Sequence, residues 1–167
     1  MGDFDITTLI LSEHEGFRRT FAELEQLSDR EELGRRWREL SDALEVHAAG
    51  EEEIFYPELL QDVDDSEADT EHAVKDHNEI RETTSAVDDH EVGSDAWWEA
   101  FRACREATVD HLGEEENDVL PPFQAQVSAE RRDELGMRWL QFHESHEDAR
   151  GLSGDTVDPE AYVEEHS

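Results

Sequence analysis

Two short segments of the chain each place a histidine four residues before a glutamate and ten residues before a proline. The first reads HAAGEEEIFYP and contains His47 and Glu51; the second reads HLGEEENDVLP and contains His111 and Glu115. In an α-helix, residues four positions apart share a face and lie about 6 Å apart along the axis. Each pair is therefore able to direct one imidazole and one carboxylate toward the same metal ion.

A single histidine precedes each segment at nearly the same distance. His14 lies 33 residues before His47, and His77 lies 34 residues before His111. The two halves of the chain are thus offset by 63 to 64 residues. We interpret this spacing as a duplicated helical hairpin.

The histidines and glutamates of these motifs are expected at a similar depth in a helical bundle. Counted from turns near residues 29 and 92, they lie about 15 to 23 residues away, within one or two helical turns of a common level. The candidate metal-binding set is His14, His47, Glu51, His77, His111 and Glu115.

Buried imidazoles and carboxylates need partners, and metal ions provide them. Four nitrogens with carboxylate oxygens suit iron, manganese or zinc, whereas calcium and magnesium prefer oxygen alone. Six side chains exceed the needs of one tetrahedral zinc, which favours two ions. If both glutamates bridge, a shared oxo or hydroxo group still leaves one or two positions open for dioxygen, peroxide or nitric oxide. The alternative is a structural bundle whose core histidines are hydrogen-bonded.

The hydrophobic pattern indicates helices, because apolar residues recur at spacings of three and four and no stretch alternates like a strand. Helices are predicted over residues 5–28, 30–60, 67–90, 95–120 and 129–149. The double proline at 121–122 should end the fourth helix, and Ser128 is a suitable N-cap for the fifth. We expect an all-α, up-down-up-down four-helix bundle with an additional C-terminal helix. Residues 1–150 would form one domain, followed by an acidic tail, 151–167, that is loose or docked in an extended form.

The chain is strongly acidic: Asp and Glu outnumber Lys and Arg by 47 to 14, for a formal net charge of −33. Four Trp and seven Phe on helical stripes indicate a folded core, so the charge belongs on the surface. Molar salt shortens the Debye length to about 3 Å and screens the repulsion of such a surface. The composition resembles that of acidic proteins from halophilic microorganisms; an acidic partner for a basic protein is the alternative. Direct nucleic-acid binding is disfavoured, because few side chains could neutralise phosphates.

The remaining bulk features predict the setting of the protein. The lone cysteine, Cys104, excludes an internal disulfide, fits a reducing compartment and falls on an apolar stripe, where it should fill the core. The N-terminal segment has neither a basic region nor an apolar stretch long enough for a signal peptide or membrane span. We therefore expect a cytoplasmic protein.

The motifs resemble those of the hemerythrin-like, or HHE cation-binding, family over about residues 8–122. The resemblance rests on a lone histidine in the first helix, DHNEI in the third, and the two segments HAAGEEEIFYP and HLGEEENDVLP. It implies a four-helix bundle with a non-haem di-iron centre bound by the six residues above. The chain departs from the marine oxygen carriers in two ways. They carry a second histidine where this chain has Ala73, and a His-x-x-x-x-Asp motif on the fourth helix. The missing nitrogen leaves more room at one iron and favours redox reactivity or sensing over reversible oxygen carriage.

Other polar residues near the motifs have weaker assignments. Glu52 and Glu116 directly follow the glutamates of the two pairs. They either orient histidines or are exposed acidic residues on the surface. His72 lies five residues before the third-helix histidine, about 140° away around the helix, so we do not expect it to bind the metal. His143 and His146 fall on or beside the apolar stripe of the fifth helix, where packing or hydrogen bonding is favoured; binding the metal or orienting one of its ligands is the alternative.

The sequence therefore favours a protein with two iron ions that binds or senses dioxygen or a related small ligand, or takes part in iron and oxygen homeostasis. Manganese or zinc is also compatible with the ligand set. A di-iron oxidoreductase acting on peroxide or nitric oxide is one alternative, and an interaction module stiffened by metal is another. A metal- or oxygen-binding protein is favoured over a dedicated enzyme. It would act as a monomer or homodimer, without a nucleic-acid or membrane partner.

Overall fold

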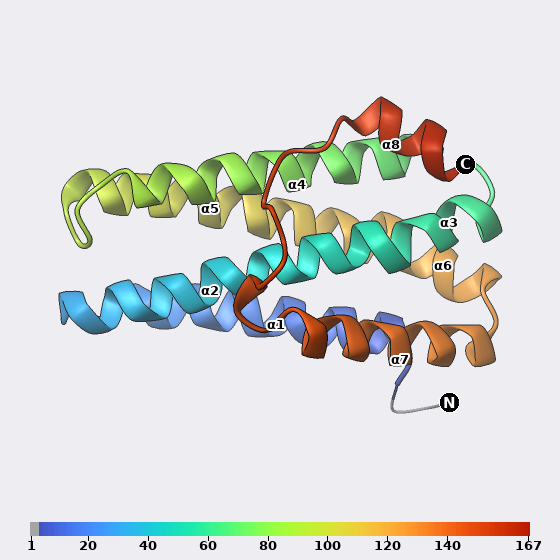
Figure 1. The fold of residues 1–167 in the computed structure, drawn as a ribbon, viewed down its shortest axis with the longest axis horizontal. Coiled ribbons are helices and arrows are strands. Elements are labelled where there is room, and N and C mark those ends of the chain that lie inside the picture. Colours follow the sequence, from blue (N-terminus) through green and yellow to red (C-terminus); the bar gives the residue numbers. More distant parts are fainter. Residues whose placement is uncertain (1–3) are drawn as a thin grey trace.

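The computed structural model describes residues 4–167, and its regular elements are all helical (Figure 1). The all-α prediction is thus confirmed. The helices are α1 (Ile6–Leu24), α2 (Arg30–Gly50), α3 (Tyr56–Asp62), α4 (Glu67–Asp88), α5 (Asp95–Glu114), α6 (Leu120–Gln126), α7 (Ala129–Ser145) and α8 (Pro159–His166). Two π-helical turns, η1 (Glu51–Phe55) and η2 (Glu115–Val119), join α2 to α3 and α5 to α6. A short 3₁₀ turn, η3 (Glu147–Ala149), follows α7.

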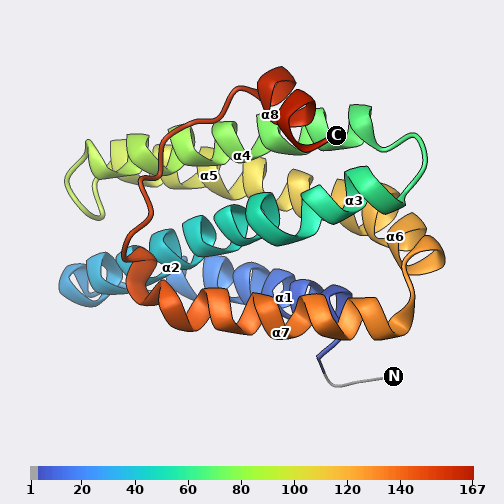
Figure 2. The same cartoon turned by 45° about the vertical axis from the view of Figure 1, so that its right-hand side comes forward.

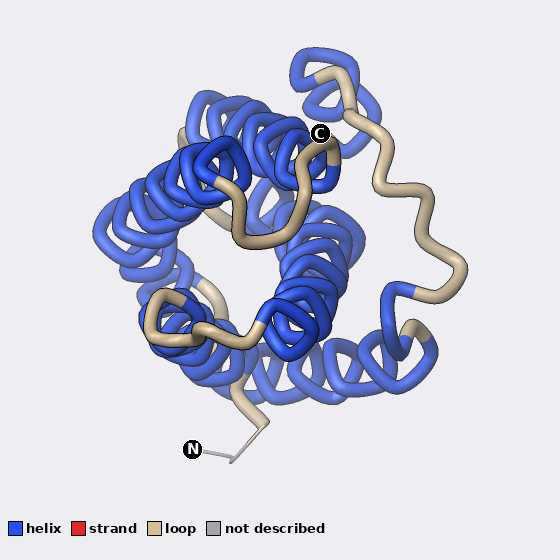
Figure 3. The backbone as a smooth tube through the Cα atoms, turned by 90° about the vertical axis from the view of Figure 1, so that its left-hand side faces the viewer, coloured by secondary structure: helices blue, strands red, loops and turns tan. Residues whose placement is uncertain are grey.

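The rods formed by α1, by α2 with α3, by α4, and by α5 with α6 lie side by side (Figures 1 and 2). Seen along their length, the rods surround a common axis (Figure 3). The helices α1 and α2 form one hairpin, and α4 and α5 form the other, as the internal repeat predicts. Helix α7 packs along the outside of α1 and α2, and α8 packs on α4.

Side-chain caps fix where several helices begin. Asp5 and Asp29 accept backbone N–H groups at the starts of α1 and α2. Ser94 caps α5, and Ser128 caps α7 as predicted. Capping oxygens satisfy N–H groups that have no acceptor within the helix, so these polar residues set the boundaries.

Two clusters of apolar side chains fill the interior on either side of the predicted histidine level. One cluster lies toward the α1–α2 and α4–α5 turns and includes Phe21, Trp37 and Phe101. The other lies toward the opposite end and includes Phe55 and Phe123. Cys104 is free and buried in the first cluster, in agreement with its predicted role in the core.

The prediction that the double proline ends the fourth helix is wrong. Pro121 and Pro122 occupy the first turn of α6, which continues to Gln126. Proline is tolerated there because the N–H groups of a first turn need no acceptor within the helix. The π-helical turn η2 ends at Val119, so a new helix begins at Leu120.

The C-terminal segment also differs from its prediction. Residues 159–166 form α8 instead of a loose or extended tail. Asn78 exchanges two hydrogen bonds with the backbone of Val157, at 2.6 and 2.9 Å, and Tyr162 is buried. These contacts dock the segment on α4. The division into a domain of residues 1–150 and a tail of 151–167 remains a prediction.

The remaining helix limits lie close to those predicted, although α1 ends at Leu24 and α7 at Ser145, four residues earlier in each case. Within residues 4–167, no helix is both long and apolar enough to cross a membrane.

Replacement of Gly136 by alanine should destabilise the fold. A Cβ at this position in α7 would lie 1.4 Å from the carbonyl oxygen of Phe4, so the segment before α1 would have to move. That segment includes Asp5, which pairs with Arg132 at 2.8 Å. We expect Gly136→Ala to lower the free energy of unfolding by about 1–3 kcal/mol, more than the gain in helix propensity.

Denaturant unfolding of the metal-free chain at fixed salt measures this change. Gly113→Ala is the control, because a Cβ there meets no atom within 4 Å. It should be neutral or stabilise by up to about 1 kcal/mol. Equal stabilities of the two variants would contradict the close approach of α7 to the N-terminal segment.

Candidate metal centre

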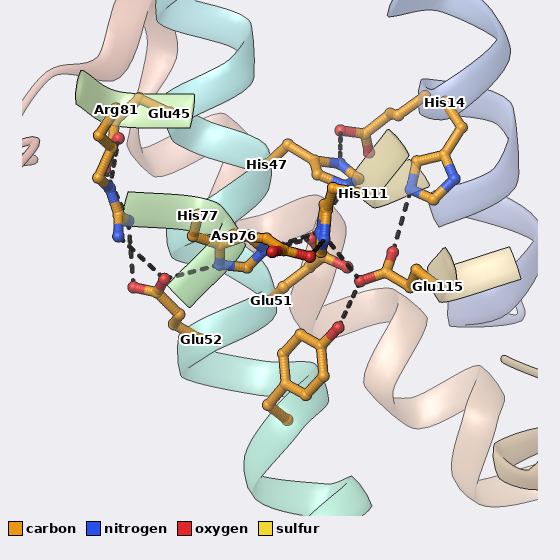
Figure 4. Close-up of polar contacts among 12 residues, drawn as sticks. His14, Glu45, His47, Glu51, Glu52, Asp76, His77, Arg81, His111 and Glu115 are labelled. Carbon is orange, nitrogen blue, oxygen red and sulfur yellow. Dashed lines mark hydrogen bonds and ion pairs between the residues drawn. The ribbon is translucent and has the colours of Figure 1, made fainter. Parts of the chain in front are cut away.

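The structure brings all six predicted side chains together in the middle of the bundle (Figure 4). Their exposed fractions are 4% or less, so the cluster is shielded from solvent. The side chains form two groups of four whose ligand-type atoms lie within 4.8 Å of one another. The first group is His14, His47, Glu51 and Glu115; the second is Glu51, His77, His111 and Glu115. Both glutamates thus belong to both groups.

Each glutamate begins a π-helical turn. Glu51 opens η1, and the Tyr56 N–H bonds to the Glu51 carbonyl; Glu115 opens η2, and the Leu120 N–H bonds to the Glu115 carbonyl. A proline follows each turn at the second position of the next helix. This arrangement explains the proline ten residues after each histidine, which the sequence alone left without a structural role. Single π turns are rare and often occur at functional sites.

The Nε2 atoms of the histidines and the carboxylate oxygens point toward one another. In the first hairpin, His47 Nε2 lies 3.1 Å from Glu51 Oε1. Between the hairpins, His14 Nε2 lies 3.1 Å from Glu115 Oε1, and His77 Nε2 lies 3.3 Å from Glu51 Oε1. These separations are short enough for a shared ion between the atoms.

Several of these atoms have no hydrogen-bond partner, although they are buried. They are Nε2 of His14, Nε2 of His47, both carboxylate oxygens of Glu51, and Oε1 of Glu115. The short contacts among them lack hydrogen-bond geometry. An unsatisfied buried polar group costs about 1–3 kcal/mol, and more when it is charged. The donor set of imidazole nitrogens and carboxylates fits divalent transition-metal ions, which would satisfy these atoms together.

The other ring nitrogen of each histidine contacts a carboxylate. The Nδ1 contacts are His14 with Glu116 at 2.8 Å, His47 with Glu13 at 3.1 Å, His77 with Glu52 at 2.7 Å, and His111 with Asp76 at 3.2 Å. An ionised carboxylate only accepts hydrogen bonds, so Nδ1 of each ring donates, and Nε2 is the nitrogen that a metal ion would bind. This pattern orients imidazoles in metal sites.

Sequence reasoning identified two of these four carboxylates and missed the others. Glu52 and Glu116 were candidates for orienting histidines, and each contacts a histidine of the other hairpin. Glu13 and Asp76 were missed; each contacts the second histidine of its own hairpin. A signal was available, because an acidic residue directly precedes the lone histidine in both halves.

The two shared glutamates differ in electrostatics. Burial, followed by the charge of Glu115, raises the pKa of Glu51 well above its usual value. Burial also acts on Glu115, but the contact with His14 and the charge of His111 outweigh it and lower that pKa. Burial and the Glu115 charge raise the pKa of Tyr56, so its O–H stays protonated and donates to Glu115 Oε2 at 2.5 Å.

The remaining candidate histidines lie outside the cluster. His72 is exposed and contacts Glu114 at 2.7 Å; together with Asp76 these two residues form a separate, more exposed group of ligand-type side chains. His146 packs against Phe142 and contacts the Arg150 carbonyl. His143 contacts the Glu13 carboxylate at 3.0 Å, which places it behind the histidine layer instead of within it.

The fold and the cluster define a helical-bundle protein with an interior set of metal-binding side-chain types. The chain belongs to the hemerythrin family: the model described as Hemerythrin HHE cation binding domain matches residues 5–123, more than half of its length. Comparisons with curated proteins and with solved structures gave no match.

Replacement of Glu51 by glutamine should stabilise the metal-free protein. Because the pKa of Glu51 is raised above its unfolded value, the carboxyl group penalises folding increasingly as the pH rises above about 4.5. Glu51→Gln removes this penalty and should raise the free energy of unfolding at pH 7. The gain should vanish as the pH falls toward 4.5.

Glu52→Gln is the matched control at the next position. Glu52 pairs with Arg81 and His77, and its pKa is lowered despite burial, so this variant should be less stable than the original chain. Denaturant unfolding from pH 4.5 to 8 compares the two. A loss of stability in metal-free Glu51→Gln would favour a structural bundle with satisfied core histidines.

Proposed function

We propose that this protein is a non-haem di-iron protein that binds or senses dioxygen or a related small ligand, or takes part in iron and oxygen homeostasis. The proposal includes an up-down-up-down four-helix bundle as its scaffold. The observation that carries it is the set of buried nitrogen and oxygen atoms without hydrogen-bond partners at the centre of the bundle. Such atoms are expensive to bury unless an ion binds them.

The geometry supports a division of the ligands between two ions. His14 and His47 would hold one ion, and His77 and His111 would hold the other, because each pair belongs to one group. Glu51 and Glu115 would bridge, since both groups contain them. Nitrogen and carboxylate donors suit iron, with manganese or zinc also accommodated. Bound iron would supply redox-active coordination positions for dioxygen, peroxide or nitric oxide.

A small cavity beside the second pair supports binding of a small ligand. It has a volume of about 30 Å³, is lined on its inner side by Tyr56, Ala73, His111 and Glu115, and opens toward solvent between exposed residues such as Asp69 and Asp118. This space suits one water-sized or diatomic molecule.

The internal repeat explains why the cavity lies in the second hairpin. Ala73 lies four residues before His77, and the corresponding residue before His14 is Ile10, which is fully buried. The short side chain of Ala73 therefore leaves space that an isoleucine fills in the first hairpin.

Iron binding is the first test. Anaerobic addition of Fe(II) to the metal-free chain should give two irons per chain by metal analysis. His47→Ala and Glu115→Ala should each fall below two, because each removes a ligand in our assignment. His90→Ala, at an exposed position before α5, should retain two. Two irons in both ligand variants would remove those residues from the site.

Exposure of the iron-loaded protein to air separates the candidate functions. Near-ultraviolet charge-transfer bands that appear and then reverse under vacuum would support ligand binding or sensing. Sustained consumption of peroxide would instead support an oxidoreductase. Tight retention of zinc with no response of the iron form to air would support an interaction module stiffened by metal.

Filling the cavity should weaken ligand binding without loss of metal. Ala73→Ile gives the second hairpin the side chain found at the same position in the first. We expect two irons per chain and a nitric oxide affinity lower by about tenfold, which corresponds to about 1.4 kcal/mol. Ala96→Ile, at an exposed position near the start of α5, is the control. Unchanged affinity in Ala73→Ile would exclude this cavity as the ligand site.

A further inference from the structure

Helix α7 reaches the metal centre, although it lies beyond the residues that match the family model, 5–123. Its Trp139 ring is nearly perpendicular to the His47 ring, with centroids 5.4 Å apart. The Trp139 side chain is fully buried, whereas His143, one turn later, is partly exposed. The helix therefore extends from solvent to the back of a proposed metal ligand.

Both side chains bind the same carboxylate. Trp139 Nε1 donates to Glu13 Oε2 at 2.6 Å, and His143 Nε2 lies 3.0 Å from Glu13 Oε1. The same Oε1 accepts from His47 Nδ1 at 3.1 Å. Glu13 is thus fixed from three directions, and its position determines the orientation of the His47 ring.

The corresponding carboxylate of the second hairpin has no such support. Asp76 contacts His111 Nδ1 at 3.2 Å, and its other histidine neighbour, His72, is an exposed residue 3.5 Å away on its own helix. No residue of α7 takes part in this contact. The carboxylates that contact His47 and His111 are therefore held by different numbers of side chains in the two halves of the centre.

The local sequence makes room for α7 on one side only. Gly50 lies against this helix, and a Cβ there would meet the Trp139 ring at 3.1 Å. The corresponding residue in the second hairpin, 64 positions later, is the exposed Glu114. Close approach of α7 is thus confined to the first hairpin.

We propose that Trp139 and His143 make α7 a positioning element of the metal centre, acting through Glu13 on His47 and therefore on only one of the two ions. This inference rests on the proposed di-iron function. Outer hydrogen bonds to a ligand histidine typically change metal affinity by about 10- to 100-fold. Loss of the α7 contacts should accordingly loosen one ion and leave the other unchanged.

Release of Fe(II) to a chromogenic chelator under anaerobic conditions measures the two ions separately. In the full-length Trp139→Phe/His143→Ala variant, one equivalent should leave about 10 to 100 times faster than in the original chain, and the second at an unchanged rate. When His143 is replaced by glutamine instead of alanine, an N–H donor remains at this position. Release of this equivalent should then return most of the way to the slow rate of the original chain. Asp76→Asn, which alters the other half, should accelerate the other equivalent, so that combination with the α7 variant accelerates both.

A matched control separates positioning from packing. Trp97→Phe makes the same substitution in the apolar cluster near the α1–α2 and α4–α5 turns. Thermal unfolding compares the stability of this variant with that of Trp139→Phe. Unchanged release of both equivalents in the α7 variant would overturn the inference. Equal acceleration of both, or acceleration in Trp97→Phe at the same loss of stability, would also overturn it. Fewer than two irons in the original chain would instead refute the proposed function.

Discussion

The structure depends on one constraint: ionisable side chains occupy a layer shielded from solvent between two apolar clusters. Burial disfavours charged carboxylates, and a second carboxylate nearby increases the penalty. Burial and the charge of Glu115 raise the pKa of Glu51, whereas the contacts with His14 and His111 lower the pKa of Glu115, so the metal-free layer disfavours two ionised carboxylates side by side. The aromatic clusters on both sides stabilise the bundle in spite of this layer. The apolar clusters therefore stabilise the fold, and the polar layer between them is suited to binding cations.

The helices adapt locally so that polar and apolar residues can alternate along one rod. A π turn contains one more residue per hydrogen-bonded turn than an α-helix, so it changes which residues face inward. Glu51 points to the polar layer at the start of η1, and Phe55, at its end, is buried in the apolar cluster. The second hairpin repeats this pattern with Glu115 and Val119. The proline after each turn allows a new helical segment to begin there.

The sequence predicted the features that recur in it. Helix locations followed from apolar periodicity, and the six central residues followed from the duplicated spacing of His14, His47, His77 and His111. The π turns could not be predicted, because the pattern of an α-helix continues through them with a shift of only one residue. The path of α6 depends on this shift, which is why the double proline was misread. The docking of α8 depends on contacts such as Asn78 with Val157, which are distant in sequence.

The outer carboxylates were only partly predictable for a related reason. In a chain with 47 acidic residues, an acidic neighbour of a histidine carries little information by itself. The contacts of Glu13 with His47, Trp139 and His143 single it out among these neighbours, because Glu13 and its partners lie on three different helices, α1, α2 and α7. Tertiary packing, and not local spacing, selects which carboxylates orient the histidines.

The contacts between the hairpins connect assembly of the fold to assembly of the centre. Glu52 of the first hairpin contacts His77 of the second, and Glu116 of the second contacts His14 of the first. Arg81 also pairs with Glu52, which fixes that carboxylate on the second hairpin's side. Neither hairpin alone contains a complete group of four ligand-type side chains, because each group in the centre draws on both. An ion that binds such a group binds only the docked state, so its binding free energy stabilises the pairing of the hairpins as well as the site.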